Sequence, residues 1–144
     1  MMEELNLKFE FSANFAKVPP QFSIYNNSYL IYPETTVTDK YTAELKVTVK
    51  DQTDNRFLIQ RFNHDQKTDQ QLILESLYVD GIDIGTILIK GRYYPVYPEP
   101  WHSQQIANNV TLPEYETGAL QWGWNGRWEL EYTVPFYTWM LKNV

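Results

Sequence analysis

Apolar and polar residues alternate along much of this chain, and a period of two is the pattern of a β-strand with one buried face. The clearest runs cover residues 5–11, 41–49 and 128–134. No long segment repeats its apolar residues at helical spacing. The core must therefore be built mainly from strands that pack face to face.

Shorter apolar runs continue the pattern, separated by residues that favour turns. These runs cover residues 23–25, 29–32, 56–62, 71–79 and 86–89. The separating clusters of proline, glycine, asparagine and aspartate lie at residues 19–20, 26–27, 51–55, 63–68, 80–81 and 125–126. Only the tail, residues 136–142, fits a short helix or one last strand. This spacing predicts an all-β fold, an antiparallel β-sandwich that is jelly-roll-like, with residues 1–144 as a single domain.

Composition narrows the possible partners. The chain has 144 residues, no cysteine and a net charge of −6. Without cysteine there is no disulfide, no cysteine-bound metal and no thiol nucleophile. Nucleic acids and anionic membranes are bound by basic surfaces, whereas the twelve lysines and arginines here form no run. We therefore expect neither nucleic acid nor membrane as a partner.

The N-terminal segment does not fit a secretory signal. Residues 1–6 are acidic, whereas a secretory signal needs a basic start and an apolar run. No apolar stretch approaches the roughly 20 residues of a membrane span. We therefore expect the chain to be made in a cytoplasm.

Aromatic residues concentrate in one part of the chain. All five tryptophans lie between Arg92 and Trp139, beside prolines and glycines. A core needs some of these rings, but rings beside irregular backbone are often exposed. Exposed aromatic groups are typical of binding surfaces. The segment therefore indicates a binding or assembly module.

Asn125-Gly126 predicts a two-residue hairpin with a type I′ turn, because this pair tolerates the positive φ that the turn requires. In that register, Trp122, Trp124 and Arg127 share the outer face of the hairpin. The two rings would form a platform for a ligand. The alternative is that residues 93–101 fold over the two tryptophans and bury them.

Prolines at positions 95, 98 and 100 stiffen the segment from residue 94 to residue 101. We expect a polyproline-like arm that presents Tyr97 and Trp101 at the rim of a binding groove. The alternative is a rigid loop that crosses the end of the sandwich.

No catalytic motif is present, so we expect a protein without enzymatic activity. His64 and His102 are not spaced as zinc ligands. Asp80 and Asp83 flank Gly81 and are candidate calcium ligands, since loop carboxylates and backbone carbonyls bind Ca²⁺. The alternative is that they are solvated turn residues.

Four strings of the C-terminal half carry a resemblance to known proteins. They lie at residues 79–83, 93–101, 123–128 and 135–139. These strings resemble small proteins of marine tailed phages. Those proteins are similar in turn to the calcium-dependent, xylan-binding type of carbohydrate-binding module.

The resemblance implies a jelly-roll sandwich and a calcium-assisted sugar site. It also implies a phage-encoded, glycan-binding module that is made in the host cytoplasm and mounted on a virion. The alternative function is a phage structural or assembly protein whose aromatic surface is a subunit interface with another virion protein or a second copy.

Overall fold

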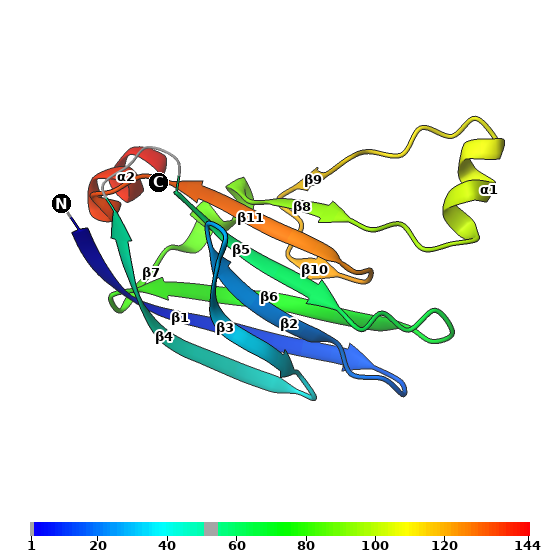
Figure 1. Cartoon of the computed structure of the whole chain (residues 1–144), viewed down its shortest axis with the longest axis horizontal. Coiled ribbons are helices and arrows are strands. Elements are labelled where there is room, and N and C mark those ends of the chain that lie inside the picture. The colour runs from blue at the N-terminus through cyan, green and yellow to red at the C-terminus, as the bar shows by residue number, and fades with distance from the viewer. Residues whose placement is uncertain (1, 51–54) are drawn as a thin grey trace.

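The computed structural model describes residues 2–50 and 55–144 and shows two antiparallel sheets packed face to face (Figure 1). The predicted all-β antiparallel sandwich is confirmed. Most of the turn expected at residues 51–55 lies outside the described residues.

The first sheet, here sheet A, holds five strands among the described residues. In spatial order they are β10 (Gln121–Trp122), β6 (Gln70–Val79), β1 (Met2–Phe15) and β4 (Lys40–Lys50), with β7 (Ile82–Asp83) paired to β6. The long strands β1 and β4 coincide with two of the clearest alternating runs of the sequence.

The second sheet, sheet B, holds six strands among the described residues. In spatial order they are β3 (Tyr29–Thr36), β2 (Gln21–Asn26), β5 (Asn55–Phe62), β11 (Gly126–Tyr132), β8 (Arg92–Pro95) and β9 (Glu116–Thr117). Three short helices complete the chain: the 3-10 helix η1 (Gly85–Lys90), α1 (Trp101–Ala107) and α2 (Phe136–Asn143). None of these helices is long and apolar enough to cross a membrane.

The core lies between the sheets, where alternate residues of each strand point inward. Phe9 and Phe11 of β1 are buried, as the alternation predicts. The ring of Phe11 stacks on Phe22 of sheet B at 4.2 Å, and the ring of Phe9 meets Phe57 edge-on at 6.2 Å. Such aromatic pairs add to the free energy of burial, so these rings help to fix how the sheets stack.

The predicted strand at residues 86–89 is wrong, because this segment is part of η1. Asp83 Oδ1 accepts a hydrogen bond from the Gly85 amide, and Gly85 has a positive φ of 52°. This turn directs the chain into the helix, where Ile87 and Leu88 are both buried. In this segment no polar residues are interspersed among the apolar ones, so their spacing fits a strand and a helix equally well. The sequence pattern therefore could not distinguish a strand from the observed 3-10 helix.

The predicted type I′ hairpin at Asn125-Gly126 is also wrong. Trp122 pairs with Leu72 in sheet A, whereas Gly126 begins β11 in sheet B. The chain therefore crosses from one sheet to the other between these positions. Neither Asn125 nor Gly126 has a positive φ.

A two-residue turn with positive φ occurs instead at Asp80-Gly81, between β6 and β7. The φ angles are 50° and 80°, and Val79 pairs with Ile82 across the turn. Two central residues with positive φ are the requirement of a type I′ turn. The turn expected at residues 80–81 is therefore confirmed, and it has the geometry that was wrongly predicted for Asn125-Gly126.

Between β8 and β9 the chain forms an arm, residues 96–115, that carries α1. Figure 1 shows α1 well beyond the ends of the sheets, at the same end of the sandwich as the β5–β6 loop. No residue of α1 is buried. The arm is the feature that sets this end of the molecule apart from a plain sandwich.

Candidate functional site

A cleft of about 820 Å³ lies at the end of the sandwich from which the arm projects. It is formed by four segments that are far apart in the sequence: residues 14–16, 64–71, 98–101 and 123–124. We call it the end cleft. Its volume falls in the range of small-molecule sites, about 300–1,000 Å³.

One wall of the end cleft is aromatic. Trp101, the first residue of α1, and Trp124, from the crossing between the sheets, have ring centroids 5.1 Å apart. Tyr97 lies behind them, 5.9 Å from Trp101 and 5.4 Å from Trp124. All three rings are only partly buried. The structure thus brings together three of the predicted ligand-binding residues.

The opposite wall is polar and comes from the β5–β6 loop. Asp65 accepts hydrogen bonds from the Lys67 amide and from the Thr68 hydroxyl, which fix the loop. His64 and Asp69 also line the cleft. The loop therefore contributes an imidazole, an ammonium group and carboxylates to the lining of the cleft.

Arg61 of β5 links the crossing between the sheets to β6 through hydrogen bonds. Its side chain is fully buried, and its guanidinium donates to the Trp122 carbonyl at 3.3 Å, to Asn125 Oδ1 at 3.1 Å and to Gln70 Oε1 at 2.8 Å. Asn125 Oδ1 also accepts from the His64 amide at 2.9 Å. A buried polar network in which every member is satisfied rigidifies its surroundings. The crossing segment and the β5–β6 loop are therefore held in register with each other.

Gln70 extends this network to the loop between β1 and β2. Its side-chain amide donates to the carbonyls of Val18 and Asn63, at 2.7 Å and 2.9 Å, and its Oε1 accepts from the Asp65 amide. Gln70 is itself buried. The β1–β2 loop, the β5–β6 loop and the crossing between the sheets thus share one hydrogen-bonded support beside the end cleft.

Burial and the nearby charge of Arg61 shift the pKa of His64. Burial, and then the nearby guanidinium, lower the pKa of His64 below 6.5, and the carboxylate of Asp65 only partly opposes them. At neutral pH the imidazole is therefore uncharged, and it can both donate and accept a hydrogen bond.

We expect acidification to destabilise the fold partly through His64. Since the pKa of the folded state lies below 6.5, the folded protein resists protonation more than the unfolded chain does. The stabilisation is complete above pH 6.5 and is lost as the pH falls through the lower folded pKa. Melting temperatures of the wild type and of His64→Gln, measured from pH 7.5 to pH 5, check this. We expect the melting temperature of the variant to fall less on acidification than that of the wild type. Equal falls in the two proteins would contradict this expectation.

Trp122 is not part of the aromatic wall, and its predicted place on an exposed platform is wrong. Its side chain is 1% exposed and stacks on Tyr93 at 5.0 Å with an interplanar angle of 8°. Its indole Nε1 donates to the Ala119 carbonyl. The prediction failed because β10 belongs to sheet A, so the residue points into the sandwich. The stated alternative was that residues 93–101 fold over the two tryptophans and bury them, and it holds for Trp122. For Trp124, Tyr97 and Trp101 of this segment pack against the ring but leave it partly exposed.

Arg127, also predicted to bind ligand, lies on the outer face of sheet B and does not line the end cleft. Its guanidinium sits 4.2 Å from the centre of the Tyr94 ring, and its Nε donates to Glu129. The wrong hairpin register had put it beside the tryptophans.

Asp80 and Asp83, the candidate calcium ligands, each accept hydrogen bonds within the protein. Asp80 binds the amide of Asn6 and the hydroxyl of Tyr137, whereas Asp83 binds the Gly85 amide. Burial would raise the pKa of Asp80, but these donors outweigh it and lower the pKa. Within residues 2–50 and 55–144, no group of three histidine, aspartate or glutamate side chains could hold a metal ion. Calcium binding by this pair stays a prediction.

The comparisons with known proteins concern the fold. No family model matches the chain, and no curated protein matches it in sequence. One solved structure, described as vCBM60 in complex with galactobiose, is similar with a TM-score of 0.55. The likeness covers 88% of this chain and 97% of that one, at 8% sequence identity. The likeness shows that the two chains share a fold.

Proposed function

We propose that this protein is a non-catalytic module that binds a neutral glycan in the end cleft. The observation that carries the proposal is the partly exposed pair Trp101 and Trp124, which lines a cleft of about 820 Å³ together with a polar loop. Galactobiose, the ligand of the similar structure, belongs to the same chemical class. The similar fold supports the proposal, whereas the phage origin and the virion location rest on the sequence strings alone.

A sugar suits this cleft for two reasons. The apolar face of a pyranose ring can stack on an aromatic side chain, and rigid aromatic groups bind at a low cost in conformational entropy. The hydroxyl groups around the ring can pair with the imidazole, amide and carboxylate groups of the loop. An aliphatic ligand would leave these polar groups without partners.

The charge of the cleft favours an uncharged ligand. Three carboxylates, those of Asp65, Asp69 and Glu99, line it against the single ammonium group of Lys67. An acidic sugar would meet net repulsion there. A neutral oligosaccharide would bring no charge and could accept or donate hydrogen bonds to each of these groups.

Two of these carboxylates, Asp65 and Glu99, favour binding without hydrolysis. A glycosidase needs a general acid whose pKa is raised, so that it is protonated at neutral pH. The hydroxyl of Thr68 and then the Lys67 amide lower the pKa of Asp65, and the hydroxyl of Ser103 lowers the pKa of Glu99. Both groups are therefore ionised at neutral pH and unsuited to this role.

We expect Trp124→Ala to weaken glycan binding by about 30-fold or more, the usual loss when a central aromatic contact of about 2 kcal/mol is removed. The test is a glycan array that includes neutral oligosaccharides such as galactobiose, read with and without Ca²⁺ and followed by titration calorimetry. Since Trp124 is partly exposed, the variant should keep nearly the wild-type melting temperature.

Tyr29→Ala is the matched control, because this residue is 75% exposed and lies in β3, at the edge of sheet B. It should bind the glycan as the wild type does. If no neutral glycan binds the wild type, or if Trp124→Ala binds equally well, the proposed function is rejected.

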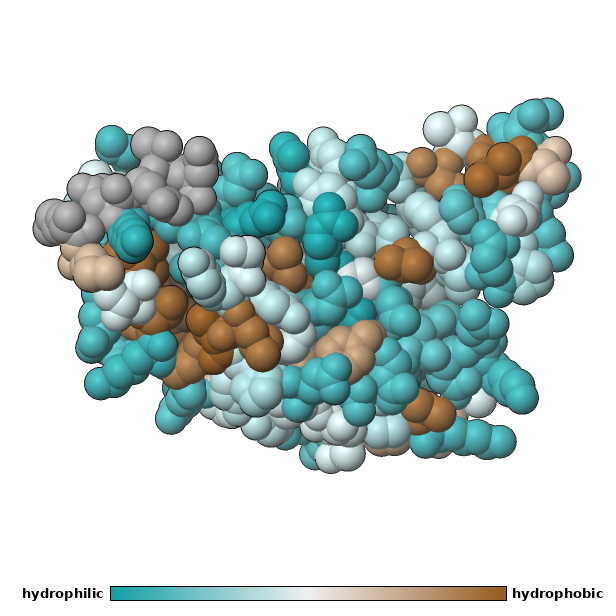
Figure 2. Space-filling model, viewed as in Figure 1, coloured by the Kyte–Doolittle hydropathy of each residue, from teal (hydrophilic) through white to brown (hydrophobic). Residues whose placement is uncertain are grey.

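A second candidate function is assembly, in which the arm packs against another protein. The observation in its favour is that apolar side chains are exposed along the arm: Val96 by 61%, Ile106 by 57%, Val110 by 42% and Tyr115 by 37%. Figure 2 shows hydrophobic side chains at the upper right, where the arm projects. A monomeric mass by light scattering at the highest soluble concentration would count against self-assembly through this arm.

A further inference from the structure

One edge of sheet A is a long strand with an open outer side. Among the described residues, β4 pairs with β1 alone, in an unbroken antiparallel register from Met2↔Lys50 to Ser12↔Lys40. In Figure 1 it runs along the lower boundary of the molecule, on the opposite side of β1 from β6. Backbone N–H and C=O groups on the outer side of an edge strand can pair with another strand.

The other edge strands have features that limit such pairing. In sheet B, β3 contains Pro33, which has no backbone N–H to donate, and its register with β2 is irregular. The strands β7, β9 and β10 have two residues each. Proline, an irregular register and a short length all protect an edge from pairing. Among the described residues, β4 is therefore the edge strand that is both long and regular, with eleven residues and no proline.

The inner side of β4 is incompletely covered. Its side chains alternate, and Ala43, Val47 and Val49 are buried in the core. Tyr41 and Leu45 point to the same side of the strand but stay partly exposed. A further strand beside β4 would cover both side chains and remove apolar surface from water.

The sequence of β4 complements itself when two copies of the strand run antiparallel, with Leu45 opposite Leu45 of the second copy. Three kinds of facing pair then form, each of them twice: Glu44 with Lys46, Thr42 with Thr48, and Tyr41 with Val49. Opposite charges, paired threonines and an aromatic ring beside a β-branched residue are all cross-strand pairs that stabilise an antiparallel sheet. Lysine on an edge strand commonly opposes pairing, but in this register Lys46 meets a glutamate.

Charge and alternation select this register. A shift by two residues places Glu44 opposite Glu44, or Lys46 opposite Lys46, and like charges directly opposite each other are destabilising. A shift by one residue turns the apolar side chains of the second copy to the outer face of the sheet. The favoured register has one like-charged pair at each end, Lys40 with Lys50, where both side chains are exposed and can turn toward water.

The charged groups at the middle of β4 are only weakly engaged within one copy. Lys46 Nζ lies 4.0 Å from Glu4 Oε1, and the two side chains are 70% and 61% exposed, so this ion pair adds little stability. Lys8 is opposite Glu44 in the register, but its ammonium group lies over the ring of Tyr78, 4.5 Å from the centre. Glu44 and Lys46 are therefore available for pairing across the edge.

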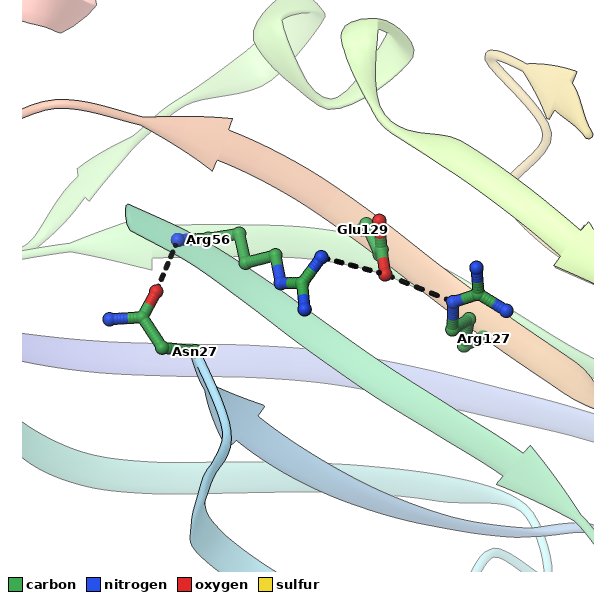
Figure 3. A network of polar contacts seen from close by, with 4 residues as sticks. All are labelled: Asn27, Arg56, Arg127 and Glu129. Atoms are coloured by element: carbon green, nitrogen blue, oxygen red, sulfur yellow. Dashed lines mark hydrogen bonds and ion pairs between the residues drawn. The ribbon is translucent and has the colours of Figure 1, made fainter. Parts of the chain in front are cut away.

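Sheet B pairs its outer charges differently. Figure 3 shows Arg56 and Arg127 on either side of Glu129, and both reach the same oxygen, Oε1, at 3.4 Å and 3.0 Å. The Glu129 side chain is only 10% exposed. These groups are already paired within one copy, whereas those at the middle of β4 face solvent.

The outer face of β1 and β4 carries little net charge. Four lysines lie on it against three glutamates: Lys8, Lys40, Lys46 and Lys50 against Glu4, Glu10 and Glu44. Two such faces can therefore meet edge to edge without strong repulsion.

We propose that the protein forms a two-fold symmetric dimer in which β4 of one copy pairs antiparallel with β4 of a second copy. The two A sheets then join into one continuous sheet, with the two-fold axis between the facing Leu45 residues. The residues that line the end cleft lie outside β4, so the contact does not involve either cleft. The two clefts lie at opposite ends of the dimer, because Lys40 is opposite Ser12, close to the cleft residue Asn14, and the paired strands run in opposite directions. The dimer does not depend on the proposed function.

The test is sedimentation equilibrium of the full chain in about 0.15 M salt, which screens the repulsion between two copies beyond about 8 Å. We expect the mass to rise with protein concentration from that of one chain to that of two. A mass of one chain up to the solubility limit overturns the proposal, and so does a mass that rises beyond two chains.

Charge exchange identifies the strand. Glu44→Lys and Lys46→Glu each place two pairs of like charges opposite each other, so each should weaken self-association about tenfold or more. Both side chains are exposed, and melting curves check that each variant is folded. An equal mixture of the two variants should form a dimer, because every facing pair then has opposite charges. Unchanged association of the single variants, or no association in the mixture, overturns the proposal.

Two variants of the arm are the controls. Glu114→Lys makes the same change of charge at an exposed residue and should leave self-association unchanged. Ile106→Lys places a charge on an apolar residue that is 57% exposed, and it should also leave the dimer intact. Loss of the dimer in Ile106→Lys but not in Glu44→Lys would assign the contact to the arm and overturn the pairing of β4.

Discussion

Trp122→Ala is expected to lower the free energy of unfolding by about 3–5 kcal/mol, the range for a large aromatic side chain truncated in a packed core. The ring is 1% exposed, stacks on Tyr93 and lies 6.3 Å from the ring of Trp128. Its loss would leave a cavity between the sheets and an unpaired carbonyl at Ala119. Urea unfolding followed by circular dichroism measures the change.

Trp124→Ala is the matched comparison, because the same residue type is changed two positions away. That ring is partly exposed at the wall of the end cleft, so its removal should cost much less stability. The two variants therefore separate a structural tryptophan from a binding tryptophan. Equal losses in both would show that Trp124 is also a core residue and would remove the basis for the cleft as a ligand site.

Gly126→Ala is expected to destabilise the fold by about 3 kcal/mol, at the upper end of what overpacking usually costs. A Cβ atom at this position would lie 2.9 Å from the ring and hydroxyl of Tyr93, and closer still to the backbone carbonyl of Tyr94. Tyr94 lies in β8, which is paired to β11, so the backbone has little room to shift. Thermal unfolding measures the loss.

Gly123→Ala is its control. A Cβ atom there would meet only the Gln70 carbonyl, at the ordinary distance of 3.6 Å, and Gly123 does not have a positive φ. Its melting temperature should stay close to that of the wild type. If Gly126→Ala melted like Gly123→Ala, the close approach of β8 and β11 would be contradicted.

Alternation in the sequence predicted the sheets well, because burial of one strand face is a local property. Leu5, Leu7, Phe9 and Phe11 were expected to point inward, and all four are buried. The partner of each strand is a long-range property, and no local pattern encodes it. For this reason Trp122 was paired with β11 across an apparent hairpin, although its partner is Leu72, 50 positions earlier in the chain.

The candidate site was predicted in part. Prolines beside aromatic residues indicated Tyr97 and Trp101, which lie together as partly exposed rings, and Trp124 joins them. The polar wall was missed, because His64, Asp65 and Asp69 were interpreted as ordinary loop residues. Arg61 gave one signal that could have been used: a charged residue at an inward position of β5, where the alternation places apolar side chains, requires buried partners.

The most direct measurement of the central claim is an NMR titration of the wild type with the neutral oligosaccharide that binds most tightly, following the indole N–H signals of the five tryptophans. The account predicts that the signals of Trp101 and Trp124 move together and saturate with the calorimetric affinity. The signals of the buried Trp122 and Trp128 should stay in place. A glycan that binds while the signals of Trp101 and Trp124 remain unchanged would contradict the account.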